Sequence, residues 1–316
     1  MLKNVPIALG VGAVSALLYL SVLMGTPGAL ILAYLSMLPI FLIGLGLNAL
    51  AAGLAAIAGA VITAAVGGLL AGAMYAAMNA APAAWICHLA LLGRSDGRGD
   101  TEWYPLGRLL TWLAGLAAAG FLFAMALGMG FEGGMQGHLE RLLDDLLRQF
   151  MESRAAPGET PPELPSLAAW AAFIPAVFGL WWILMMAING ALAQGLLVRL
   201  GRQRRPTPKL TTLELPPRLL YALVAALVLA FLPGDAGYVG QTLAALLAVP
   251  YLFLGLAVMH MLIRRMPGAP VVFVVFYVFM LIFGWPLFLI TGLGLVEQWA
   301  GLRRRLGDDD KGQEVE

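Results

Sequence analysis

The chain has 316 residues, of which 61% are hydrophobic and 12% charged, and its mean hydropathy is +0.86. Soluble domains carry roughly 25% charged residues, so this composition excludes an ordinary soluble fold. The 19 basic and 18 acidic residues leave a net charge of +1, which provides no basic field for nucleic acid. We therefore expect an all-α, polytopic bundle of transmembrane helices whose first partner is the lipid bilayer.

Charged residues occur in a few islands, and the apolar gaps between them predict the membrane spans. A helix needs about 20 apolar residues to cross a hydrocarbon core about 30 Å thick. Residues 4–93 contain no charge and have room for four spans. The later gaps predict one span each in 109–131, 164–198 and 236–263, and a short one in 219–234.

The stretch 266–296 is too long for one simple helix, and Gly284-Trp285-Pro286 interrupts it. Proline removes a backbone donor and breaks or bends a helix, so this stretch predicts a hairpin of two short passes.

Basic residues of short loops stay in the cytoplasm, and the island at 199–218 is the most basic. Ten passes, with both termini cytoplasmic, would place every basic cluster on that side. Eight passes also fit the gaps, and nine would put Arg303 and its neighbours outside.

One polar segment, 138–154, has leucines at steps of three and four and predicts an amphipathic helix outside the membrane. It is either a lid over an outward-facing cavity or a structural helix at the interface. The chain is predicted to form a single membrane domain, 1–316, with four parts. These are N-terminal helices (1–131), the external helix with a Pro-rich linker (132–165), C-terminal helices (166–302) and a charged cytoplasmic tail (303–316).

Small residues recur at every fourth position between Ala52 and Ala80, with a turn expected at Gly67-Gly68. A shorter stripe of the same kind, in the first helix, consists of Ala8, Gly12 and Ala16. Such stripes let helix backbones approach closely in lipid. They predict either tight packing within the chain or a docking face for a membrane partner subunit.

No catalytic, cofactor or metal site is expected. The three histidines are far apart in sequence, and neither a nucleophile motif nor a phosphate-binding loop is present. The lone cysteine, Cys87, excludes an intrachain disulfide. Glu297 is expected at the membrane interface, and residues 202–218 are expected to be a cytoplasmic connector rather than a site. The protein is therefore predicted not to be an enzyme.

Neutral polar side chains inside apolar runs are costly in lipid unless they find partners. Helix breaks near proline and glycine are where membrane proteins build small-molecule sites. The candidate ligand-lining residues are Asn79, His88, Trp181, Trp182, Asn189 and Gln194. Hydrogen bonding between helices is the alternative role for each of them.

Three stretches together resemble the YybS-like family of uncharacterised bacterial membrane proteins. They are LSMLPIFLIGLGLNALAAGLAAIAGAVITAA from Leu35, MNAAPAAWICHLAL around Pro82, and LFLITGLGLVEQWAGLRRR from Leu287. That family is distantly similar to the solute-binding S components of energy-coupling factor transporters. The resemblance implies a bundle in the bacterial cytoplasmic membrane that captures a small solute, with small residues of the first helix docking on a coupling subunit. The alternative is a membrane scaffold that binds other membrane proteins. The solute is not defined.

Overall fold

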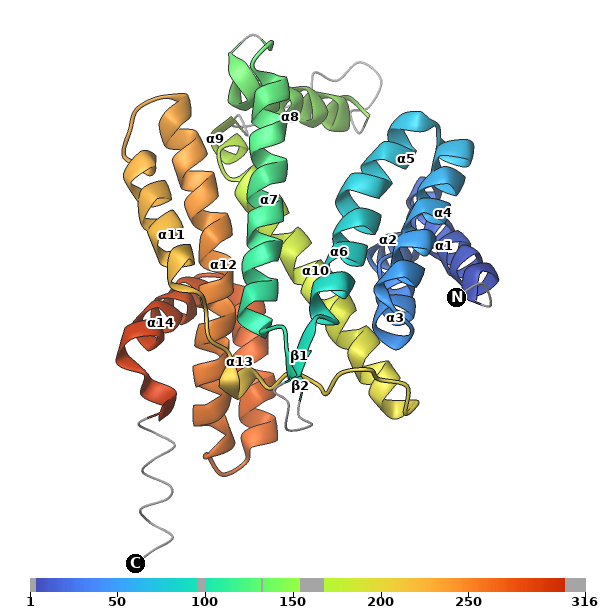
Figure 1. Ribbon diagram of the computed structural model, residues 1–316. Coiled ribbons are helices and arrows are strands. Elements are labelled where there is room, and N and C mark those ends of the chain that lie inside the picture. The colour runs from blue at the N-terminus through green and yellow to red at the C-terminus, as the bar shows by residue number, and fades with distance from the viewer. Residues whose placement is uncertain (1–3, 96–100, 132, 154–167, 305–316) are drawn as a thin grey trace, which may run out of the picture. The chain divides into compact units, whose positions relative to one another are not determined.

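The computed structural model describes residues 4–95, 101–131, 133–153 and 168–304, which are almost entirely helical (Figure 1). The predicted Pro-rich linker and most of the charged tail lie outside these residues. The chain folds as two compact units. Unit 1 comprises Met1–Leu113, Leu184–Pro216 and Pro250–Glu316, and unit 2 comprises Ala114–Ile183 and Pro217–Val249.

The first 93 residues form four spans, as the uncharged run predicted. The helices are α1 (Val5–Leu20, extended by the 3-10 turn Ser21–Met24), α2 (Pro27–Tyr34), α3 (Leu38–Gly46), α4 (Ala49–Gly67), α5 (Leu69–Tyr75) and α6 (Ala81–Ala90). Side chains mark two of the starts, since Thr26 Oγ1 accepts from the Ala29 N–H at 3.2 Å and Asn48 Oδ1 from the Ala51 N–H at 2.8 Å. These bonds satisfy donors that a helix N-terminus leaves free, so Asn48 acts as a helix cap.

Small residues bring these first helices into backbone contact. A Cβ added at Gly12 would overlap the carbonyl oxygen of Ala55, and one at Gly72 would overlap Ala64. The predicted break at Gly67-Gly68 is confirmed, because α4 ends at Gly67 and Gly68 has φ +88°. The long stripe thus divides between α4 and α5, which pack on each other.

A π-helical turn, Ala76–Ala80, joins α5 to α6 just before Pro82. Polar groups beside it are paired inside unit 1, because the Ser15 hydroxyl donates to the carbonyl oxygen of Ser36 and lies 2.6 Å from the Tyr75 hydroxyl. All three side chains are fully buried. Interhelical bonds of this kind fix which faces of the apolar helices meet.

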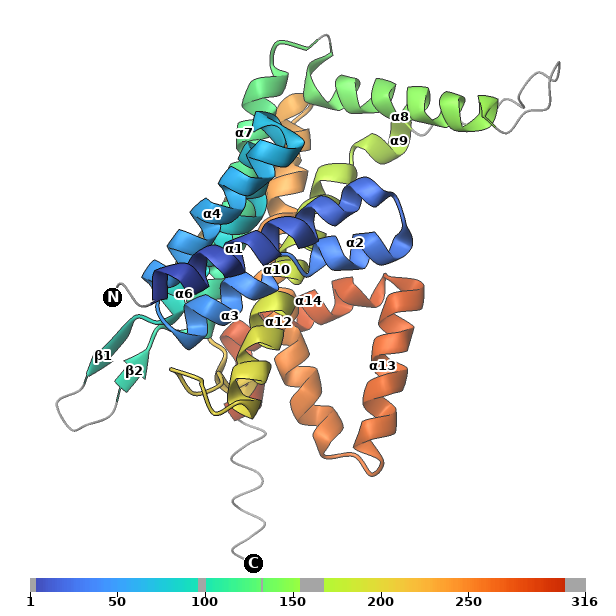
Figure 2. The same ribbon diagram turned by 90° about the vertical axis from the view of Figure 1, so that its right-hand side faces the viewer.

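After α6, the charged island forms a short hairpin of strands β1 (Gly93–Ser95) and β2 (Thr101–Trp103). The next helices are α7 (Leu106–Gly128), α8 (Gly134–Glu152), α9 (Ala168–Ala171) and α10 (Ile174–Arg199). In unit 2, α8 turns away from the end of α7 and runs crosswise to it (Figure 2). No described residue of α8 is buried, and Leu142, Leu146 and Phe150 leave about half of their surface exposed. The predicted amphipathic helix is therefore confirmed, and the described protein covers its apolar face only in part, where α8 contacts α9.

The last helices are α11 (Pro217–Ala230), α12 (Asp235–Arg264), α13 (Ala269–Phe283) and α14 (Pro286–Ala300). The described residues include seven helices long and apolar enough to cross a membrane, or eight spans if α13 and α14 count as one. Ten full passes would require α11, α13 and α14 to cross singly. At 1.5 Å per residue, helices of 14 or 15 residues reach only about 22 Å, less than the thickness of the hydrocarbon core.

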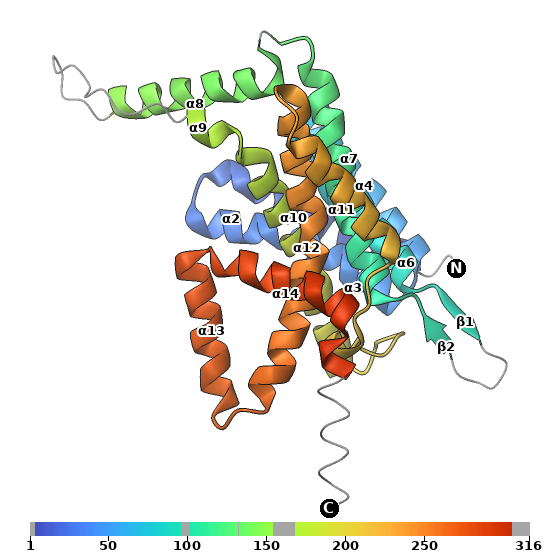
Figure 3. The same ribbon diagram turned by 90° about the vertical axis from the view of Figure 1, so that its left-hand side faces the viewer.

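The break at Gly284-Trp285 lies where the sequence predicted it, and the two helices meet there at 116° (Figure 3). α14 then packs across α12 so closely that a Cβ at Gly294 would overlap the carbonyl oxygen of Tyr251. Arg303, just beyond α14, bonds to the segment that joins α10 to α11. The ends of α10 and α14 therefore lie close together, as the hairpin prediction requires, although α13 and α14 are each too short to be a full pass.

Candidate functional site

Unit 1 contains a cavity of about 470 Å³. Its wall is built by α3, α6, the start of α7, α10, the second half of α12 and α13. Most of this wall is apolar, with Phe41, Leu110, Met186 and Phe253 among its side chains. Volume and lining are typical of pockets that hold a small organic molecule.

The segment 200–216, which we call the connector, covers part of this cavity with Arg205, Thr207, Pro208 and Leu210. The sequence predicted a connector over residues 202–218, and the segment does join α10 to α11, but four of its residues also line this cavity. Arg205 is only 7% exposed, whereas Arg202 and Arg204 beside it are exposed. One of the basic residues thus faces the protein interior, which no counting of charges could reveal.

Arg205 is held by backbone carbonyl groups. Its Nη1 donates to the carbonyl oxygen of Ala90 at 2.9 Å, and Nη2 lies 3.5 Å from that of Tyr104. Ala90 is the last residue of α6, where carbonyl groups are unpaired and the helix dipole is negative, so a cation is favoured there. Burial lowers the pKa of this guanidinium. Gln194 completes the arrangement, since its Nε2 donates to the Arg205 carbonyl oxygen at 2.9 Å.

A second polar pair, His260 and Tyr277, lines the same cavity. His260 Nδ1 lies 2.8 Å from the carbonyl oxygen of Leu256, which can only accept, so Nδ1 carries the proton. Nε2 lies 3.2 Å from the Tyr277 hydroxyl, within hydrogen-bond distance. The ring also lies 4.8 Å from that of Phe273, measured between centroids. This arrangement joins α12 to α13.

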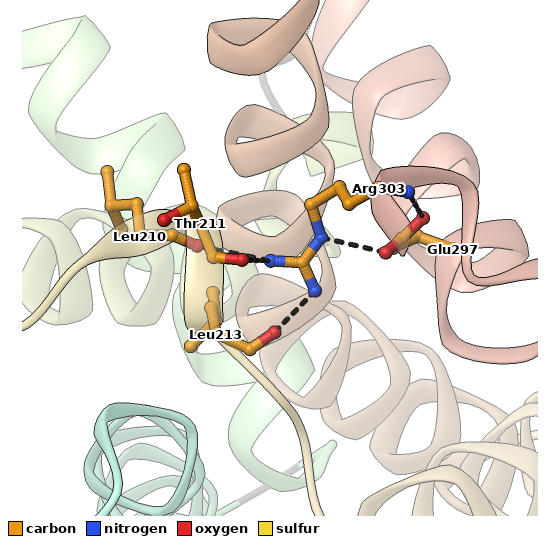
Figure 4. Close-up of polar contacts among 5 residues, drawn as sticks. All are labelled: Leu210, Thr211, Leu213, Glu297 and Arg303. Atoms are coloured by element: carbon orange, nitrogen blue, oxygen red, sulfur yellow. Dashed lines mark hydrogen bonds and ion pairs between the residues drawn. The ribbon is translucent and has the colours of Figure 1, made fainter. Parts of the chain in front are cut away.

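The far end of the connector is fixed by Arg303, which follows α14 (Figure 4). Its Nη1 donates to the carbonyl oxygens of Leu210 at 3.2 Å and Thr211 at 2.8 Å, and Nη2 to that of Leu213 at 2.6 Å. Nε forms an ion pair with Glu297 at 2.7 Å. We call Arg303 and Glu297 the latch, because Arg303 holds the connector by three hydrogen bonds and is itself held by Glu297.

Glu297, which was expected at the membrane interface, lies in the last turn of α14 and is covered by protein. The residue is 5% exposed, and its carboxylate also accepts from the Arg303 backbone N–H at 3.3 Å. Gly301, with φ +58°, ends α14 between the two residues and lets the chain turn back. Opposite charges on either side of a helix-ending glycine are the sequence signal that could have predicted this pair.

The structure separates the predicted ligand-lining residues. Gln194 lines the large cavity, and His88 lines a smaller one of about 390 Å³ together with Asn48, Trp103 and Arg204. The remaining four line neither cavity: Asn79, Asn189, Trp181 and Trp182.

Each of these four has another place in the fold. Asn79 is buried in the π-helical turn. Asn189 Nδ2 donates to the carbonyl oxygens of Tyr34 and Met185, each at 2.9 Å, so it joins α10 to the end of α2. Trp181 and Trp182 belong to unit 2, where Trp181 is 54% exposed and Trp182 is buried. The search for neutral polar residues inside apolar runs thus found buried side chains, but the structure does not bring them together in one site.

The stripe of α1 that was expected to dock on a partner is occupied within the chain. Ala8 and Ala16 are fully buried, and Gly12 is in contact with the backbone of α4. A partner subunit could reach this face only by displacing α4.

The described residues contain no group of three His, Cys, Asp or Glu side chains placed to hold a metal ion.

Comparison with known protein families gives one match, to a family of predicted membrane proteins of unknown function (DUF2232), which covers residues 13–297. The chain belongs to this family. That membership confirms the family expected from the sequence motifs. No curated protein and no solved structure matches the chain.

Proposed function

We propose that this protein binds a small, mainly apolar molecule in the cavity of unit 1 and does not transform it chemically. The cavity is the observation that carries the proposal. Its polar side chains are already engaged in holding the fold, as Gln194 holds the connector and His260 holds Tyr277. Such a wall suits binding and orientation, whereas catalysis needs a base and a nucleophile in contact with the substrate.

The connector gives the proposed site a closing element. It contributes four residues to the wall, and it is held at one end by Arg205 and at the other by the latch. Moving the connector away would break a few hydrogen bonds and would leave the ion pair between Arg303 and Glu297 in place. A solute-binding subunit similar to an S component, energised by a separate membrane partner, is the form of this function that the family resemblance favours.

Ligand binding can be tested by filling the cavity. Gly190 lines it, and a Cβ there would meet the Phe41 ring no closer than 3.6 Å, so a larger side chain can enter without striking the backbone. Purified wild-type protein is expected to gain thermal stability with decanol, a neutral alkyl probe, because ligands that bind only the folded state stabilise it. Gly190→Leu should abolish that gain. Gly115→Leu, at a helix position of unit 2 with open space around it, is the matched control.

Absence of decanol stabilisation in the wild type, or an equal gain in Gly190→Leu, would contradict binding in this cavity. Screening vitamins and their precursors by the same thermal assay then searches for the natural solute. Purification from native membranes in parallel tests for a stoichiometric partner. A partner without any stabilising solute would favour the scaffold role instead.

A further inference from the structure

Arg205 is the one arginine or lysine among the described residues that line the large cavity, and none of those residues is an aspartate or a glutamate. A buried positive charge acts more strongly on a group that comes beside it than a solvated charge does, because less water screens it. The sign of a ligand's charge should therefore matter for binding at this wall.

The positive charge of the Arg205 guanidinium has no anionic partner among the contacts of the described residues. Its contacts among the described residues are with the neutral carbonyl groups of Ala90 and Tyr104, and its Nε is buried without a hydrogen-bond partner. Buried cations in proteins are ordinarily paired with an anion, because desolvation of an unpaired charge is costly. The contrast with Arg303 is direct, since its Nε is paired with Glu297. None of the described residues that line the cavity supplies an anion to pair with Arg205.

We infer that the molecule bound in this cavity is an amphipathic anion, with a carboxylate or phosphate group beside Arg205 and an apolar body along α3, α7 and α10. This inference rests on the proposed binding function and specifies its ligand. Carboxylate and phosphate oxygens match the donor geometry of arginine, and charge-assisted hydrogen bonds are about twice as strong as neutral ones. The same wall disfavours an alkyl cation. The anion comes either from a free alkyl acid or from a lipid with one acyl chain.

The inference can be tested with probes that share one alkyl chain and differ in the head group: decanoate, decyl phosphate, decanol and decylammonium. Their affinities are measured on purified protein by competition against a fluorescent alkyl probe. Decanoate and decyl phosphate are expected to bind about tenfold to a hundredfold more tightly than decanol, and decylammonium more weakly than decanol. Lysophosphatidate is added as the lipid-derived anion, so that its affinity relative to decanoate identifies the source.

Variants locate the preference at Arg205. Arg205→Gln should remove the preference for anions, measured as the ratio of decanoate to decanol affinity, whereas Arg205→Lys should retain part of that ratio. Arg202→Gln removes the same charge from an exposed position of the connector and should behave as the wild type. If Arg205→Gln does not fold, the ratio of decanoate to decylammonium affinity in the wild type decides the question.

Equal affinity for decanoate and decylammonium, or a preference that survives in Arg205→Gln, would overturn the inference while decanol binding still supports the cavity as a site. Failure of every probe, decanol included, would instead refute the proposed function itself.

Discussion

The latch between Arg303 and Glu297 offers the sharpest test of how the connector is held. Arg303→Met keeps most of the aliphatic length of the side chain but removes all four bonds of the guanidinium. It also leaves the Glu297 carboxylate buried, where the backbone N–H of residue 303 still donates to it. The two side chains are 11% and 4% exposed, so solvent screens their interaction little.

The expected loss of stability follows from that geometry. Removing one partner of a buried ion pair typically costs about 3–5 kcal/mol, because the remaining charge is uncompensated. Glu297→Gln preserves the shape and an acceptor for Arg303 Nε, and removes only the charge, so we expect roughly 1–2 kcal/mol. The double variant should lose less than the sum of the two, since no unpaired carboxylate remains, with a coupling of about 0.5–3 kcal/mol.

Free energies of unfolding can be measured by titrating purified protein from mild detergent into SDS, followed by tryptophan fluorescence. Arg304→Met is the matched control, because that side chain is exposed and should change stability by no more than about 0.5 kcal/mol. Hydrogen exchange adds a local measurement, and the connector amides should exchange faster in Arg303→Met. Additive single and double variants, or unchanged exchange in the connector, would refute the assignment of Arg303 and Glu297 as its latch.

Three further predictions concern packing, the external helix and topology. Gly294→Ala should lower the thermal midpoint, because the added Cβ would overlap the backbone of α12. Gly292→Ala, two positions away with open space around it, should be neutral or stabilising by about 0.4–1 kcal/mol. A similar loss of stability in both variants would contradict the close approach of α14 to α12. If the apolar face of α8 rests on the bilayer, Leu146→Trp should show blue-shifted fluorescence in liposomes and Asp145→Trp should not, while equal emission maxima would place α8 in water. Because the full-length helix α10 separates the two positions, Asp145→Cys and Arg202→Cys should react with a membrane-impermeant reagent from opposite sides, and labelling of both from one side would exclude the topology.

The sequence by itself determined the membrane class, the first four spans, the amphipathic helix α8 and the two breaks at Gly67-Gly68 and Gly284-Trp285. Each of these follows from local chemistry. Uncharged runs about 20 residues long can be solvated only by lipid, and glycine or proline changes the backbone wherever it occurs. Membership of the family likewise follows from the order and spacing of sequence motifs.

The tertiary structure decided which polar side chains face one another. Arg205 and Arg202 belong to the same basic run, yet only the packing of the connector against α6 buries Arg205. Glu297 and Arg303 appeared to be separate charges near a membrane end until Gly301 turned the chain back and the connector met it. Hydropathy describes the preference of each side chain for water or lipid. It carries no information about contacts between segments that are distant in the sequence. The cavity and its one arginine therefore could be found only in the folded chain.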